Sequence, residues 1–141
     1  MIGMSILLVD DEARFLQTTQ KLLARSGYAV QTAPGGTEAL ELLKQGPVHV
    51  VFLDVKMPGM DGLTTLKEIK RQFPLVEVIM LTGHATVEYA VEGMRSGASD
   101  YLMKPVDPEV MIEKAMLAFE KRRHIEEKIR MAQARKPVKS T

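Results

Sequence analysis

Short apolar segments alternate along the chain with longer segments of helical spacing. The apolar segments are continuous runs rich in Val, Ile and Leu, which is typical of strands that are covered on both faces. These strand-like runs occupy residues 5–9, 28–30, 48–53, 76–81 and 100–103. Apolar residues three and four positions apart fill the other segments, at 15–23, 39–43, 63–69, 87–94 and from about 107 to 119. The pattern predicts strands and helices in strict alternation.

Glycine and proline mark the ends of the predicted helices. Ser26-Gly27, Gly46-Pro47, Phe73-Pro74 and Ser96-Gly97 follow the first four helical segments, and such pairs end helices. Strands and helices in this alternation predict a doubly wound α/β sandwich around a parallel sheet. We expect right-handed crossovers, and a binding site at the carboxyl ends of the strands.

Composition narrows the class of protein. The 141 residues are 45% hydrophobic, as in one globular domain, and contain no Cys, which excludes disulfides, thiolate zinc sites and cysteine nucleophiles. No run of about 18 apolar residues predicts a membrane span. The first residues lack the basic stretch of a secretion signal. We therefore expect a cytoplasmic protein that does not contact a membrane.

Charge divides the chain into two parts. Residues 1–120 carry 11 Lys and Arg against 16 Asp and Glu, whereas residues 121–141 carry 8 against 2. We expect a domain over residues 4–120, followed by a basic helical extension and tail over 121–141. A solvated helix end explains the basic charge better than contact with nucleic acid.

The last helix is expected to outrun the domain. Ile112, Met116 and Phe119 form its predicted docking face. A second stripe with heptad spacing runs beside it, through Met111, Ala115, Ala118, Arg122, Ile125, Ile129 and Ala132. Because alanines and an arginine weaken this seam, we expect a lone helix that ends near residue 133, with a dimerising helix as the alternative. The chain stops at Thr141 without a DNA-reading or catalytic output domain, so we expect output by protein contact.

Polar side chains stand where four of the predicted strands end. Asp10 and Asp11 follow the first strand, Asp54 the third, Thr82 the fourth and Lys104 the fifth. Because parallel strands place these ends along one edge of the sheet, we expect the side chains to converge.

Each of these residues also has an ordinary explanation. Asp10 or Asp11 could cap the following helix, and Thr82 could cap the fourth helix. Asp54 could stabilise a turn, and Lys104 could be a surface lysine. The set together argues otherwise, because three neighbouring carboxylates repel one another and need cations nearby. Lys104 supplies one charge, and Mg²⁺ suits a site of carboxylate oxygens that also meets a phosphate.

Two other classes of site fit poorly. His84 is the one imidazole expected near this edge, which gives little support to a transition metal. Asp10-Asp11-Glu12 stands where a nucleotide-binding or flavin-binding protein would place glycines.

These residues resemble the receiver domains of two-component response regulators. The resemblance rests on Asp10-Asp11, on Leu53-Asp-Val-Lys-Met-Pro-Gly-Met-Asp-Gly62, on Thr82-Gly83 and on Lys104-Pro105, and it covers residues 4–120. It implies the flavodoxin-like strand order 2-1-3-4-5.

The resemblance also implies roles. Asp54 matches the residue that accepts a phosphoryl group from a phosphohistidine of a sensor histidine kinase or a histidine phosphotransfer protein. Asp10, Asp11, Asp54 and the main-chain carbonyl of Lys56 match the Mg²⁺ ligands. The chain would then be a signalling phosphoacceptor that catalyses its own phosphorylation and dephosphorylation.

Further roles concern the switch. Lys104 and Thr82 match the residues that contact the phosphoryl group, and the bond to Pro105 resembles one that is cis in the family. Thr82 and Tyr101 resemble a pair that rearranges together and changes the surface of the fourth helix, fifth strand and fifth helix. That surface, or the extended last helix, could also form a homodimer.

Lys56 and His84 match positions that influence the lifetime of the phosphoryl group, and His84 could make dephosphorylation depend on pH. Two alternatives remain. One is a pseudo-receiver that binds partners without phosphorylation, although the complete set of site residues argues against it. The other is a metal-dependent phosphatase with an aspartyl nucleophile, although Asp54-Val55-Lys56 lacks the second acid of the haloacid-dehalogenase pattern.

Overall fold

The chain folds into a parallel sheet between two layers of helices. The computed structural model describes residues 3–55, 60–83 and 87–135. Within them the sheet has the order β2-β1-β3-β4-β5, and every pair of neighbours is parallel, as predicted. The strands are β1 (Ser5–Val9), β2 (Ala29–Ala33), β3 (Val50–Asp54), β4 (Glu77–Thr82) and β5 (Asp100–Met103). The helices are α1 (Ala13–Arg25), α2 (Gly36–Gln45), α3 (Gly62–Gln72), α4 (Val87–Arg95) and α5 (Pro108–Ala134).

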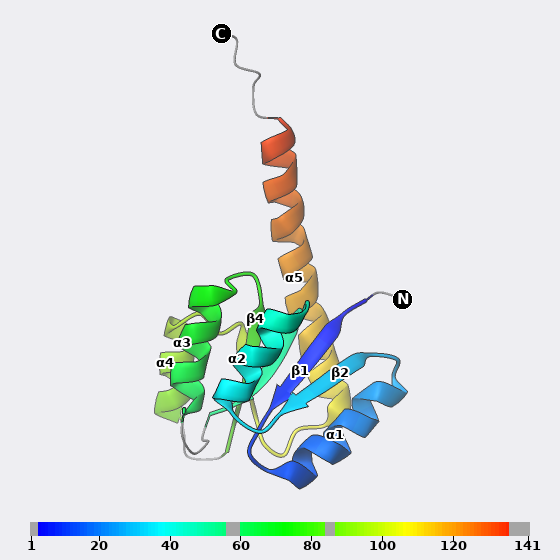
Figure 1. Ribbon diagram of the computed structural model, residues 1–141, viewed down its shortest axis with the longest axis vertical. Helices are drawn as coiled ribbons and strands as arrows, with labels where there is room; N and C mark the ends of the chain where they lie inside the picture. The colour runs from blue at the N-terminus through cyan, green and yellow to red at the C-terminus, as the bar shows by residue number, and fades with distance from the viewer. Residues whose placement is uncertain (1–2, 56–59, 84–86, 136–141) are drawn as a thin grey trace.

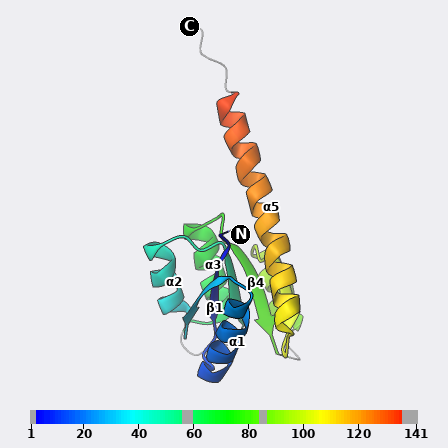
Figure 2. The ribbon, with the colours of Figure 1, turned by 90° about the vertical axis from the view of Figure 1, so that its right-hand side faces the viewer.

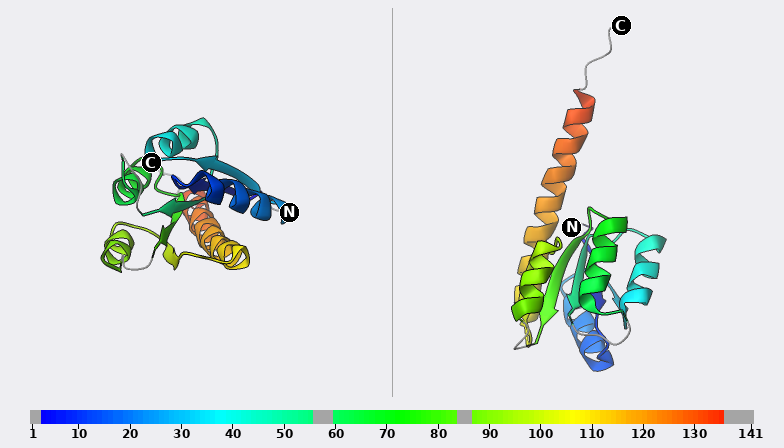
Figure 3. Two further views of the ribbon diagram at one scale, coloured as in Figure 1. Left: turned by 90° about the horizontal axis from the view of Figure 1, so that it is seen from below. Right: turned by 90° about the vertical axis from the view of Figure 1, so that its left-hand side faces the viewer.

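The helices divide between the two faces of the sheet (Figures 2 and 3). α1 and α5 cover one face, where Leu16 and Ala115 pack against Phe52 and Leu81. α2 and α3 cover the other face, with α4 beside α3. Every residue of β3 and β4 is buried, because helices cover both of their faces. This explains why the apolar runs in the sequence are continuous.

Some strand ends differ from the prediction. β2 continues through Gln31 and Thr32 to Ala33, beyond the predicted end at residue 30. β2 lies at the edge of the sheet, and its residues alternate in exposure. Polar residues on its exposed face are therefore compatible with a continuing strand. β3 and β4 each extend one residue further than predicted, to Asp54 and Thr82.

The predicted helix ends are confirmed. α1 ends before Ser26-Gly27 and α4 before Ser96-Gly97, with Gly27 at φ 91° and Gly97 at φ 108°. In this left-handed region glycine has no steric penalty. At the start of α5, the Asp107 side chain accepts a hydrogen bond of 2.9 Å from the Glu109 N–H, as an N-cap does.

The predicted docking face of α5 is correct for Ile112 and Phe119, which pack against the core, and wrong for Met116. Met111, Ala115 and Ala118 are buried against the sheet, whereas Met116 is 45% exposed. Ile112 and Phe119 are half-buried beside them. The small side chains at positions 115 and 118 let the helix axis approach the sheet closely, which favours this stripe over the bulkier one. The first half of the heptad seam is therefore already buried within the domain.

α5 projects far beyond the rest of the domain (Figure 1). Its 27 residues span about 40 Å at 1.5 Å per residue, whereas a strand of four to six residues spans about 13–20 Å. The helix starts at the carboxyl edge of the sheet and overruns the amino edge. It ends at Ala134, close to the predicted residue 133. Among the described residues, no helix combines the length and apolarity needed to cross a membrane.

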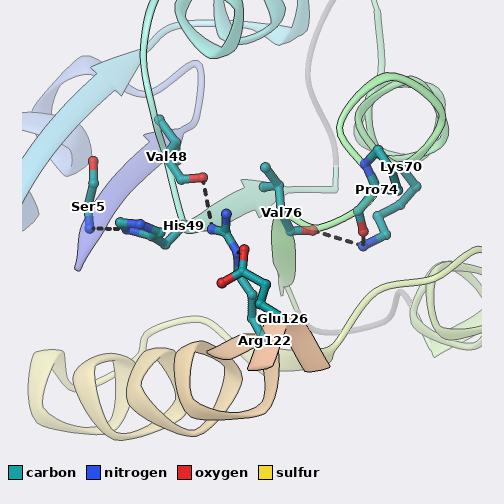
Figure 4. A network of polar contacts seen from close by, with 8 residues as sticks. All are labelled: Ser5, Val48, His49, Lys70, Pro74, Val76, Arg122 and Glu126. Carbon is teal, nitrogen blue, oxygen red and sulfur yellow. Dashed lines mark hydrogen bonds and ion pairs between the residues drawn. The ribbon is translucent and has the colours of Figure 1, made fainter. Parts of the chain in front are cut away.

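Polar contacts hold α5 where it leaves the domain (Figure 4). The Arg122 guanidinium donates to the Val48 carbonyl at 3.4 Å and pairs with Glu126 at 3.1 Å. The His49 ring stands edge-on to Phe119, with 5.0 Å between the ring centroids. Its Nδ1 accepts a 2.9 Å hydrogen bond from the Ser5 N–H. These contacts tie α5 to the amino ends of β1 and β3.

His49 should make folding stability depend on pH. Burial first, and the nearby Arg122 second, lower the pKa of His49 below its ordinary value of 6.5, while Glu126 acts in the opposite sense. The unfolded chain therefore binds a proton before the folded chain does. As the pH falls below 6.5, we expect the free energy of unfolding to decrease by at most about 1.4 kcal/mol per pH unit from this group.

Urea unfolding at about pH 7.5 and about pH 5.5 tests this expectation against His49→Gln, which does not titrate. The stability advantage of the parent over the variant should shrink on acidification. An advantage that is constant with pH would contradict the assignment.

α3 begins in direct contact with the end of β3. A Cβ added at Gly62, the first residue of α3, would lie 2.3 Å from the Asp54 carbonyl oxygen and 2.7 Å from Val55 Cα. The Gly62 N–H donates to the Val55 carbonyl at 3.0 Å. Asp61 caps the helix by accepting from the Thr64 N–H at 2.8 Å. Gly62 thus lets a helix rest on the segment that carries Asp54.

We expect Gly62→Ala to lower the free energy of unfolding by about 1–3 kcal/mol, because backbone atoms must move to admit the methyl group. Gly46→Ala is a matched control, since a Cβ there meets nothing within 4 Å and the backbone is extended. Denaturant unfolding measures the free energy of unfolding of both variants. Equal values for Gly62→Ala and Gly46→Ala would show that the contact between residue 62 and the end of β3 is not constraining.

Candidate functional site

Three carboxylates meet at the carboxyl edge of the sheet. One oxygen each from Asp10, Asp11 and Asp54 lies within 4.8 Å of the others. Val9 and Leu53 are paired in the β1–β3 ladder, so Asp10 and Asp54, which follow them, lie side by side. Asp10 is 1% exposed and Asp54 8%, whereas Asp11 is exposed. The predicted convergence of the acids is therefore present.

Lys104 brings one positive charge to this cluster. Its Nζ lies 2.5 Å from Asp10 Oδ2 and 3.8 Å from Asp54 Oδ1. The Lys104 N–H donates to the Thr82 carbonyl at 2.7 Å, which continues the β4–β5 ladder to the lysine. The Lys104–Pro105 peptide bond is cis, as the resemblance implied. Lys104 is thus not an unpartnered surface lysine.

The cluster lacks balancing positive charge among the described residues. Three carboxylates face one ammonium group, an excess of two negative charges at a partly buried site. With its other oxygen, Asp10 accepts a 3.0 Å hydrogen bond from the Glu12 N–H. The N-cap residue of α1 is Glu12 itself. A hard dication with oxygen ligands would restore the balance.

The remaining predicted site residues lie at differing depths. Thr82 is 3% exposed and ends β4 within the sheet. Tyr101 is 43% exposed on the edge strand β5, so its ring is directed outward in this conformation. Lys56 and His84 lie outside the described residues, and their predicted roles stay predictions.

The apolar spacing of the first helix predicts a core position for Phe15 and no role at the site. Lys104 Nζ nevertheless lies 4.6 Å from the centroid of its ring. Phe15 also borders a groove of about 590 Å³ between α1 and the segment after β5. The signal in the sequence was the place of an aromatic residue in the first turn after the acidic pair.

Comparison with known protein families supports the resemblance to receiver domains. The model of the response regulator receiver domain matches residues 6–116. Among curated proteins, the transcriptional regulatory protein ZraR of Escherichia coli K12 is 43% identical over 105 residues, which are 74% of this chain and 24% of that protein. The chain thus spans about a quarter of the length of this relative.

Solved structures agree with the fold. The receiver domain of NtrX from Brucella abortus is 37% identical, covers 82% of this chain and 98% of its own, and gives a TM-score of 0.78. A longer NtrX structure from the same organism is 33% identical, covers 99% of this chain and 32% of its own, and gives a TM-score of 0.86. The acidic cluster, the fold and these similarities together lead to one conclusion: the chain belongs to the response regulator receiver domain family of two-component signal transduction.

Proposed function

We propose that this receiver domain accepts a phosphoryl group on Asp54 from a phosphohistidine of a sensor kinase or a phosphotransfer protein. The observation that carries the proposal is the position of the Asp54 carboxylate. It ends β3, shares the edge of the sheet with Asp10 and Asp11, and lies 3.8 Å from Lys104 Nζ. At 8% exposure it is shielded from most of the solvent, while the exposed Asp11 beside it keeps the cluster open on one side.

Asp10, Asp11 and Asp54 would hold Mg²⁺, together with the main-chain carbonyl of Lys56. The donor set fits, because it consists of carboxylate oxygens that carry more negative charge than the one ammonium group beside them offsets within the described part of the chain. When bound, Mg²⁺ neutralises charge on the acids and on the phosphoryl oxygens.

The transfer is a displacement at phosphorus. An Asp54 carboxylate oxygen forms the new O–P bond while the P–N bond to the donor imidazole breaks, and the imidazole leaves with the electron pair of that bond. An anionic nucleophile approaching an anionic group meets repulsion, so positioning and charge neutralisation supply most of the rate. Lys104 can move toward the new oxygens, and the Thr82 hydroxyl can donate a hydrogen bond to them.

Phosphorylation would then change the surface formed by α4, β5 and α5. Turning Thr82 toward the phosphoryl group vacates space at the end of β4, and the outward ring of Tyr101 could move in to fill it. The same surface offers a partner exposed apolar side chains: Tyr89, Val91, Met94, Tyr101, Met103 and Leu117. A nearly complete switch needs about 5.5 kcal/mol of differential interaction.

Intact mass after incubation with acetyl phosphate and Mg²⁺ tests the acceptor. We expect one added phosphoryl group in the parent and none in Asp54→Asn, because the amide is a poor nucleophile. Asp100→Asn, at an exposed carboxylate paired with Lys114, is the matched control and should match the parent. No adduct on the parent would favour a pseudo-receiver, and turnover of a general phosphomonoester would favour a phosphatase.

Calorimetric titration with Mg²⁺ tests the metal ligands. We expect Asp11→Asn to weaken binding by about tenfold or more, because it removes the ligand charge and replaces one of the two oxygens with an amide nitrogen. Glu12→Gln removes the adjacent exposed charge and should weaken binding by no more than about twofold. Equal losses in both variants would assign the effect to general electrostatics and reject the ligand set.

A further inference from the structure

The Lys104 ammonium group meets an aromatic ring as well as the acids. Phe15 lies in the first turn of α1, and the centroid of its ring is 4.6 Å from Lys104 Nζ. This is within the range at which a ring face attracts an ammonium group. The ring is half-buried and packs against the core between α1, α5 and the sheet. It is therefore a fixed surface for the lysine.

Lys104 needs such a surface because its own chain is flexible. A lysine side chain loses much rotamer freedom when it is held in one place, and here it is 22% exposed at the edge of the site. Lys104 Nζ is 2.5 Å from Asp10 Oδ2 and 3.8 Å from Asp54 Oδ1. With Asp10 as its one contact, the ammonium group would stay close to the end of β1. The ring offers the ammonium a second contact outside the acid cluster.

An aromatic ring suits this position better than a polar group. A third carboxylate beside Nζ would add negative charge where an anionic group must enter. A hydrogen-bond acceptor would occupy one of the three N–H donors of the ammonium group. The ring face attracts the cation without taking a donor and without adding a formal charge. The ammonium can then release Asp10 and still be held near Asp54.

We propose that Phe15 is a positioning residue for phosphoryl transfer, and that its ring face holds the Lys104 ammonium group within reach of both Asp10 and the phosphoryl oxygens on Asp54. The role rests on the proposed function, because it presupposes transfer to Asp54. It differs from simple core packing in one respect: it requires the π face of the ring and not only its volume.

The first experiment observes the contact without any phosphoryl donor. In protein labelled with ¹³C-lysine, the ring current should shift the ε-CH₂ signal of Lys104 upfield. Phe15→Tyr should keep the shift and Phe15→Leu should abolish it. An unshifted Lys104 signal in the parent would overturn the proposal. This measurement does not depend on whether the protein accepts a phosphoryl group.

The second experiment measures the rate of adduct formation from acetyl phosphate at saturating Mg²⁺. Phe15→Leu should lower the rate about two- to fivefold, equivalent to about 0.5–1 kcal/mol, whereas Phe15→Tyr should match the parent. Leu22→Ala is the matched control, since Leu22 lines the same groove on α1 and should leave the rate unchanged. Denaturant unfolding confirms that each variant is folded.

A double-mutant cycle separates the ring contact from packing. In a Lys104→Met background, Phe15→Leu should have no further effect on the rate. If Phe15→Leu matches the parent, if Phe15→Tyr is as slow as Phe15→Leu, or if the loss persists in Lys104→Met, the positioning role is wrong. Absence of any adduct in the parent would instead reject the proposed function, and the role of Phe15 with it, while the NMR shift would still report on the contact.

Discussion

The pairing of one ammonium group with a cluster of carboxylates is the interaction on which this edge of the domain depends. Lys104 and Asp10 are 94 positions apart in the chain, and their strands, β5 and β1, are not neighbours in the sheet. The lysine therefore joins the two ends of the site across the ends of β3 and β4. Removing one partner of a buried pair leaves an uncompensated charge, which costs more than the pair itself contributes.

The sheet makes this crowding unavoidable. Parallel pairing aligns the carboxyl ends of β1 and β3, and the ladders continue to Asp54 and Thr82, the last residues of their strands. The backbone hydrogen bonds of the sheet thus fix the positions of side chains that repel one another. The stability of a core in which β3 and β4 are wholly buried opposes the repulsion. The carboxylates of this site repel one another, and the packing of the fold keeps them together.

The sequence allowed the fold and the acid cluster to be predicted because both follow from periodicity and strand order. Continuous apolar runs identify strands covered on both faces, and parallel strand ends must share an edge. Periodicity was a poorer guide for α5, where the stripe through Ala115 and the stripe through Met116 have the same spacing. Only the close packing of the helix on the sheet distinguishes them, and packing depends on residues distant in the chain.

Phe15 illustrates the same limit at the site. Its spacing predicts a core position in α1, and it does pack against the core. Its second contact depends on where Lys104 lies, which is set by the Lys104 N–H bond to the Thr82 carbonyl and by the pull of Asp10. A pattern in one helix carries no information about a side chain that arrives from another strand.

α5 connects this site to the opposite end of the molecule. It begins shortly after Lys104, runs the full depth of the sheet and leaves at the amino edge, where Arg122 and His49 hold it. Met111, Ala115 and Ala118 pack the first half of α5 against the sheet, so a displacement of its first turn must either move the whole helix or break these contacts. A displacement of the first turn would therefore have to overcome the contacts of Arg122 with Val48 and of Phe119 with His49 before it reaches the projecting half of α5.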